Sequence, residues 1–186
     1  SLEIGADHLY LPKFDRMDTA ELLNYIRDGR DDRIFAIAEL LRRHTDVGLV
    51  ANATQIDMLF LDTVRNIIDE EASLKEQPFD VDELAYAKSM GFSDAAIARL
   101  WETAEDEIAQ IRSKNNIRPV YKMIDTCASE FESYIPYFYA TYEDENESRV
   151  SDRKKILVLG SGPIRIGQGV EFDYSTVHAV RTIKES

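Results

Sequence analysis

The feature that most constrains the fold is one strand-like segment near the C-terminal end of the chain. Residues 155–160, KILVLG, form a short apolar run without alternation, as in the strands of parallel sheets. A glycine-rich loop follows, and residues 174–185 then have helical spacing of their apolar side chains, with Ser175 as the predicted cap. One strand and one helix cannot bury both faces of a sheet. We therefore expect residues 154–186 to be the incomplete start of an α/β domain whose other strands lie outside this chain.

The preceding part of the chain has the apolar spacing of helices from Met17 to Arg112. Gly91 stands where a glycine commonly ends a helix. Several of these helices have an apolar face that must be buried against a neighbour, which predicts a mainly α, helical-bundle fold. The predicted N-caps are, in chain order, Asp18, Thr45 or Asp46, Thr54, Asp80, Ser93 and Thr103.

The pattern changes after Pro119. Five aromatic side chains occur within residues 134–142, which favours extended chain lying against a surface. Residues 143–153 are polar without an apolar period and are typical of a linker. The sequence thus predicts a helical bundle, an extended linker, and then the truncated β-loop-α piece.

Charge and cysteine content exclude several classes of protein. The whole chain has a net charge of −13. Residues 151–186 hold six Lys or Arg and four acids, a net charge of +2, so the net charge of the first 150 residues is −15. Such an acidic body repels phosphate backbones, so we expect no nucleic-acid partner. Cys127 is the only cysteine and fits a reducing compartment. No apolar run is long enough for a membrane span and no signal peptide is evident, which predicts a cytoplasmic protein with no membrane partner.

The glycine loop departs from both standard phosphate grips. A dinucleotide fingerprint beginning at Gly160 would need glycine where Arg165 stands, and a P-loop beginning at Gly162 would need lysine where Gln168 stands. The three histidines have no partners at metal-ligand spacing. The residues therefore predict no catalytic, cofactor-binding or metal-binding site in this chain.

Residues 89–101, SMGFSDAAIARLW, leave two other functions open. A Met-Gly-Phe turn between short helices is similar to ubiquitin-associated domains, which would make the chain a stand-alone interaction module. The rhythm of capped helices that continues to Lys114 also fits a helix-turn-helix DNA-binding domain. Against DNA binding, the second helix opens with three acids, where contacts to phosphate would be needed.

Long stretches of the chain resemble one family, the large chain of carbamoyl phosphate synthetase. The resemblance extends over nearly the whole chain and is carried by 56–71 (IDMLFLDTVRNIIDEE), 87–101 (AKSMGFSDAAIARLW), 124–131 (IDTCASEF), 134–143 (YIPYFYATYE) and 158–175 (VLGSGPIRIGQGVEFDYS). It implies a fragment with four parts: 1–14, a junction from the first synthetase half; 15–118, a helical oligomerisation domain; 119–153, an aromatic extended linker; and 154–186, the start of the second-half α/β domain that precedes the ATP-grasp fold.

The resemblance also implies a function for the parent chain. That chain would be an ATP-dependent carbon–nitrogen ligase that uses ATP with Mg or Mn and serves arginine or pyrimidine synthesis with a glutaminase small subunit as partner. The fragment lacks the ATP-grasp residues, so we expect it to hold no cofactor and to be inactive alone.

Two sets of residues receive roles from the resemblance. Arg165, Gly169 and Glu171 match positions near the tunnel that passes carbamate between the synthetase halves. Self-association implies an exposed apolar face, for which the candidates are Ile56, Leu59, Phe60, Val64 and Ile67.

Overall fold

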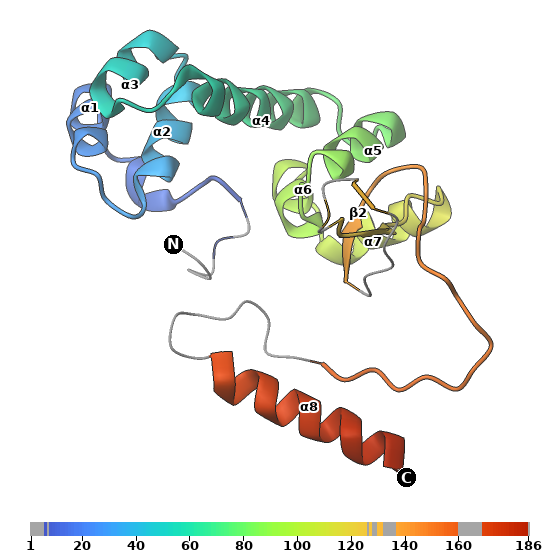
Figure 1. Ribbon diagram of the computed structural model, residues 1–186. Helices are drawn as coiled ribbons and strands as arrows, with labels where there is room; N and C mark the ends of the chain where they lie inside the picture. The colour runs from blue at the N-terminus through green and yellow to red at the C-terminus, as the bar shows by residue number, and fades with distance from the viewer. Residues whose placement is uncertain are drawn as a thin grey trace. The chain divides into compact units, whose positions relative to one another are not determined.

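The computed structural model describes residue 6, residues 8–125, residue 127, residues 130–131, residues 137–159 and the helix 169–185, without the side chains of 169–173. The chain divides into two compact units, Ser1–Ser148 and Arg149–Ser186, each of which is described by itself. The elements of the first unit are η1 (Pro12–Phe14), α1 (Thr19–Arg27), α2 (Arg33–Arg42), α3 (Val47–Thr54), α4 (Met58–Glu76), α5 (Val81–Ser89), α6 (Asp94–Leu100), α7 (Glu105–Lys114), β1 (Val120–Met123) and β2 (Phe138–Thr141) (Figure 1). The predicted mainly helical fold is confirmed.

The first hydrophobic core joins α1, α2, α3 and the N-terminal half of α4. Its fully buried side chains include Leu22 and Ile26 of α1, Leu40 of α2 and Leu61 of α4. Phe14 of the short helix η1 is buried in the same cluster. The N-terminal segment therefore belongs to this bundle.

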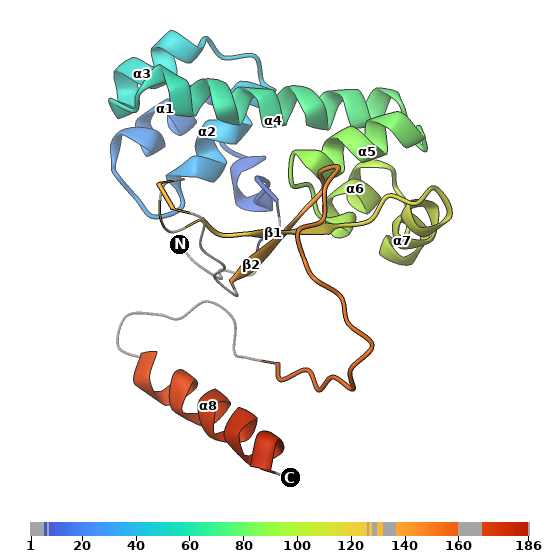
Figure 2. The same ribbon diagram turned by 45° about the vertical axis from the view of Figure 1, so that its right-hand side comes forward.

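The second core joins the C-terminal half of α4 to α5, α6 and α7. Leu74 of α4 packs there with Leu84, Ile97 and Ile108, all fully buried. The indole N–H of Trp101 donates a 2.8 Å hydrogen bond to the Leu74 carbonyl, which fastens the end of α6 to α4. Both views show α4 running from the α1–α3 helices to the α5–α7 helices (Figures 1 and 2). One continuous helix thus contributes to both cores.

Local chemistry explains most helix starts. The carboxylate of Asp18 accepts from the Glu21 N–H while Glu21 accepts from the Asp18 N–H, a complete capping box. Asp46, Asp80 and Ser93 also cap the helices that follow them, as predicted. Gly91 adopts a φ of +93°, which suits glycine at the end of α5.

Three predicted caps are wrong. Asp57, not Thr54, caps α4, because α4 begins only at Met58, whereas Thr54 is the last residue of α3. The cap position of α7 is Ala104, and the Thr103 hydroxyl donates to Glu107 instead. The third cap, Ser175, lies inside the last helix, which is described below.

A two-stranded antiparallel ribbon follows the helices. Val120 pairs with Thr141 and Met123 with Phe138. The Lys122 ammonium lies 3.7–3.8 Å from carboxylates of Glu143, Glu145 and Glu147 in the chain after β2. The segment predicted to be extended therefore forms a hairpin-like pair, with residues 120–123 bonded to residues 138–141. Tyr134, one of its five aromatic residues, lies outside the described residues.

The second unit contains α8 (Gly169–Glu185), which begins six residues before the predicted cap Ser175. Residues 155–159 do not form the predicted strand, and Ile156, Leu157 and Leu159 are exposed. A strand needs a hydrogen-bonded neighbour, and among the described residues of this unit none forms a strand.

Candidate functional site

The two cores meet at a buried ion pair between α2 and α4. Arg42 donates from Nε to Glu71 Oε2 at 2.7 Å and from Nη2 to Glu71 Oε1 at 2.9 Å. Arg42 Nη2 also donates to the Leu9 carbonyl at 2.7 Å, which ties the N-terminal segment to both helices. Burial opposes the charged form of Arg42, but the bonds and charges of Glu71 and Glu39 outweigh it and raise the pKa of the guanidinium. The pair is a fixed structural clamp.

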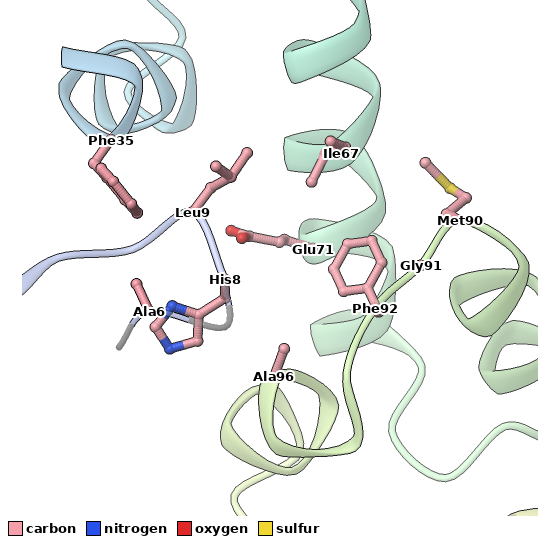
Figure 3. Close-up of a pocket in the computed structure, with 10 residues that line it drawn as sticks. All are labelled: Ala6, His8, Leu9, Phe35, Ile67, Glu71, Met90, Gly91, Phe92 and Ala96. Atoms are coloured by element: carbon pink, nitrogen blue, oxygen red, sulfur yellow. The ribbon is translucent and has the colours of Figure 1, made fainter. Parts of the chain in front are cut away.

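A cavity of about 300 Å³ lies beside this clamp, where side chains of α2, α4, α6 and the N-terminal segment converge (Figure 3). Its lining is mostly apolar, and the Glu71 carboxylate at its wall is already neutralised by Arg42. Glu71 is therefore not a free acid in this cavity. It is lined by Ala6, His8, Leu9, Phe35, Ile67, Glu71, Met90, Gly91, Phe92 and Ala96.

A second charge cluster, here called the Asp94 cluster, joins α5, α6 and α7. It consists of Asp94, Lys88, Arg112 and the ring of Tyr142. Lys88 Nζ donates to Asp94 Oδ1 at 2.9 Å, and Arg112 donates from Nε at 2.9 and 3.0 Å and from Nη2 at 2.5 Å. Burial opposes ionisation of Asp94, but the hydrogen bonds from Arg112 and Lys88 prevail and lower its pKa.

Tyr142 connects the Asp94 cluster to the β-ribbon. The Lys88 ammonium lies 5.0 Å and the Arg112 guanidinium 5.8 Å from the centre of the Tyr142 ring, within range of cation–π attraction. Tyr142 follows β2 directly, so these contacts hold the ribbon against the α5–α7 helices. Sequence reasoning missed this cluster, and the aromatic density of the segment around Tyr142 is the signal that could have indicated it.

Glu70 is an acid buried beside another acid. Its side chain is 6% exposed, and the Oε1 atoms of Glu70 and Glu83 are both buried with no hydrogen-bond partner among the described residues. Burial, and secondarily the charge of Glu83, raises the pKa of Glu70 to about 7. Two helices, α4 and α5, therefore meet across a pair of carboxyl groups that cannot both ionise without cost.

We expect this pair to make stability depend on pH. The raised pKa means that the folded chain holds the Glu70 proton more tightly than the unfolded chain does. The resulting stabilisation is full below pH 4.5 and is lost as pH rises to about 7. A Glu70→Gln variant lacks this loss, so its free energy of unfolding relative to wild type should rise by about 2–3 kcal/mol between pH 4.5 and pH 8.

Urea unfolding at a series of pH values measures the difference. An exposed acid on the same helix, Asp69, supplies the control, since Asp69→Asn should leave the profile close to wild type. Parallel profiles for Glu70→Gln and wild type would contradict the assignment.

The predicted self-association face is divided by the structure. Leu59 and Phe60 are exposed, at 69% and 65%. Val64, in contrast, is buried in the first core. Ile56 is half-buried against the first core and Ile67 against the second. The five residues therefore do not form one free surface.

Phe60 instead borders a groove of about 250 Å³ between α2 and α4, here called the α2/α4 groove. Ile34 is 41% exposed on this groove because it stands in the first turn of α2, at the edge of the core. Sequence reasoning missed its place beside Phe60. The groove is lined by Arg30, Asp31, Arg33, Ile34, Ile37, Ile56, Phe60, Leu61 and Val64.

The described residues contain neither a grouped set of metal ligands nor a long apolar helix. Within that part of the chain, no three His, Cys, Asp or Glu side chains are grouped so that they could hold a metal ion. None of the helices there is both long and apolar enough to cross a bilayer.

Comparison with protein-family models gives the relationship of the chain to known proteins. Residues 1–116 match the carbamoyl-phosphate synthetase large chain, oligomerisation domain. The chain belongs to the carbamoyl-phosphate synthetase large chain family. Residues 152–186 match the carbamoyl phosphate synthase preATP-grasp domain. The resemblance found in the sequence is thus confirmed, and together the two matches are those of a segment of such a large chain.

The family match does not favour the two other functions. Its first part includes the whole of the segment that suggested a ubiquitin-associated or helix-turn-helix module. The first turn of α7 carries Glu105, Asp106 and Glu107, all exposed, which would repel a phosphate backbone.

The residues predicted to line a carbamate tunnel fall in the second family match. Arg165 lies outside the described residues. Gly169 and Glu171 lie in the first turn of α8, in the part whose side chains are not described. Their role in a tunnel stays a prediction.

Proposed function

We propose that this chain is the connecting segment of a carbamoyl-phosphate synthetase large chain, and that its own role is the association of large chains. The observation that carries the proposal is the order of the two family matches: an oligomerisation domain over residues 1–116, then the preATP-grasp match over 152–186. The helical unit provides the rigid body for this role, since two cores are tied by α4 and by the Arg42–Glu71 pair.

In this proposal the parent large chain is an ATP-dependent carbon–nitrogen ligase that makes carbamoyl phosphate from ATP, bicarbonate and ammonia. It works in the cytoplasm for arginine or pyrimidine synthesis, with ATP and Mg or Mn as cofactors and a glutaminase small subunit as partner. The glycine loop of this chain lacks the lysine of a P-loop, where Gln168 stands, and the third glycine of a dinucleotide fingerprint, where Arg165 stands. We therefore assign the nucleotide chemistry to other parts of the large chain.

The carbamate tunnel belongs to the same proposal. Arg165, Gly169 and Glu171 would form one wall of a sheltered path between the synthetase halves. Carbamate is an unstable anion, and a path that excludes water would preserve it.

We expect the purified 186-residue chain to associate. Sedimentation velocity over a range of concentrations should give a weight-average mass that rises above the 21.3 kDa of one chain. The same samples should show no bicarbonate-dependent ATP turnover. A mass that stays at one chain at every concentration would overturn the association role, and ATP turnover would overturn the assignment of nucleotide chemistry to other parts.

A further inference from the structure

The α2/α4 groove and the aromatic ring of Phe60 lie side by side, so one surface carries both an apolar hollow and a projecting apolar side chain. Phe60 is 65% exposed at the border of the groove, and Ile34, at 41%, forms the opposite border on α2. Between them the floor is made by side chains that belong to the first core, among them Leu61 and Val64. An exposed ring next to an apolar hollow is costly in water and is relieved when a matching surface covers it.

The charged side chains around this surface include two cations, whereas the chain as a whole has an excess of acids. Arg30, Asp31 and Arg33 border the hollow, while Asp57 precedes Phe60 by one turn on the same side of α4. The net charge of −13 makes two copies repel each other over most of their surfaces. At the groove, in contrast, Asp57 of one copy can approach Arg33 of the other, while Arg30 is shared with Asp28 of its own chain at 3.1 Å.

We propose that the α2/α4 groove is the interface through which two copies of this chain associate, with Phe60 of each copy inserted into the groove of the other. The inference rests on the proposed association of large chains and names the surface that performs it. A ring and a hollow that lie side by side on one face are brought together reciprocally by a two-fold axis passing between them. The same operation places Asp57 of each copy toward Arg33 of its partner.

Phe60→Asp tests the interface with little risk to folding. Phe60 is mostly exposed and is the third residue of α4, where a carboxylate is favoured by the helix N-terminus. The new charge would enter an apolar hollow, so the dissociation constant of the dimer should rise at least about 30-fold, as for a central interface residue.

Leu49→Asp is the matched control. Leu49 is 53% exposed, is also the third residue of its helix, α3, and does not line the groove. Its replacement should change the dissociation constant by less than about threefold. Circular dichroism and thermal melting establish that both variants are folded.

Mixing two variants gives the decisive measurement. Ile34→Arg alone should also weaken association, because it places a third cation at the border of the groove, beside Arg30 and Arg33. In a mixture with Phe60→Asp, the carboxylate of one copy faces the guanidinium of the other, while the native ring and isoleucine meet at the second contact. Sedimentation should therefore show tighter association in the mixture than in either variant alone.

The outcomes separate the interface from the association role. If wild type associates and Phe60→Asp associates equally well, the interface is overturned and self-association stands. If Phe60→Asp weakens association but the mixture shows no recovery, reciprocal insertion is overturned. A wild-type chain that remains monomeric, with the groove covered by another segment of its own chain or by a different partner, overturns both.

Discussion

Asp94→Asn is expected to lower the free energy of unfolding by about 3–5 kcal/mol, because it leaves two cations in a poorly hydrated site without their anion. Asp94 is 12% exposed, Lys88 7% and Arg112 19%, so water cannot replace the lost carboxylate. The amide keeps the size of the side chain, which makes the effect one of charge and of lost hydrogen-bond acceptance. Urea unfolding at pH 7 followed by circular dichroism measures the change.

A control acid separates this effect from a general change of charge. Asp69→Asn removes one carboxylate from the exposed side of α4 and should alter the free energy of unfolding by no more than about 0.5 kcal/mol. If Asp94→Asn costs as little as Asp69→Asn, the Asp94 cluster does not stabilise the packing of α5, α6 and α7.

The Arg42–Glu71 pair should give a comparably large effect in a double-mutant cycle. Arg42→Met alone leaves the Glu71 carboxylate, which is 5% exposed, without its bidentate partner, and should cost about 3–5 kcal/mol. Glu71→Leu alone leaves the guanidinium with Glu39 at 3.4 Å and the Leu9 carbonyl at 2.7 Å, and should cost less than Arg42→Met. The double variant replaces the pair by apolar side chains and should be closer to wild type than either single variant, so the two changes should not add.

An exposed pair provides the comparison for this cycle. Arg65 and Asp62 lie on α4 at 2.8 Å with side chains 47% and 41% exposed, and Asp62→Asn should cost less than about 1 kcal/mol. Additive effects at Arg42 and Glu71 would contradict direct coupling between the two side chains.

The sequence predicted the helices and several of their starts because the responsible contacts are local. Asp18 and Ser93 bond to N–H groups three residues away, and such short-range chemistry can be identified in a single sequence. Thr54 failed as a cap because a better acceptor, Asp57, stands three residues later at the true start of α4. Helix boundaries are decided by such competition among neighbouring side chains.

The candidate surface and the ion pairs could not be predicted in the same way, because they depend on long-range packing. Arg42 and Glu71 are 29 residues apart and meet only after α2 packs on α4. The five candidates for the self-association face were grouped together, but α4 is shared by two cores, so Val64 and Ile67 pack in different clusters while Leu59 remains exposed. The association role was inferred from the family resemblance, because apolar periodicity alone does not distinguish core positions from interface positions.

The continuity of α4 has a mechanical consequence. Its 19 residues include neither glycine nor proline, so they form one stiff rod about 28 Å long rather than two segments with a hinge. A force applied to the α1–α3 end is delivered to the α5–α7 end as a tilt of that rod, and the pairing of Arg42 with Glu71 prevents the rod from rolling freely on α2. The helical unit is therefore built as a lever, able to carry a displacement from one end to the other without bending between them.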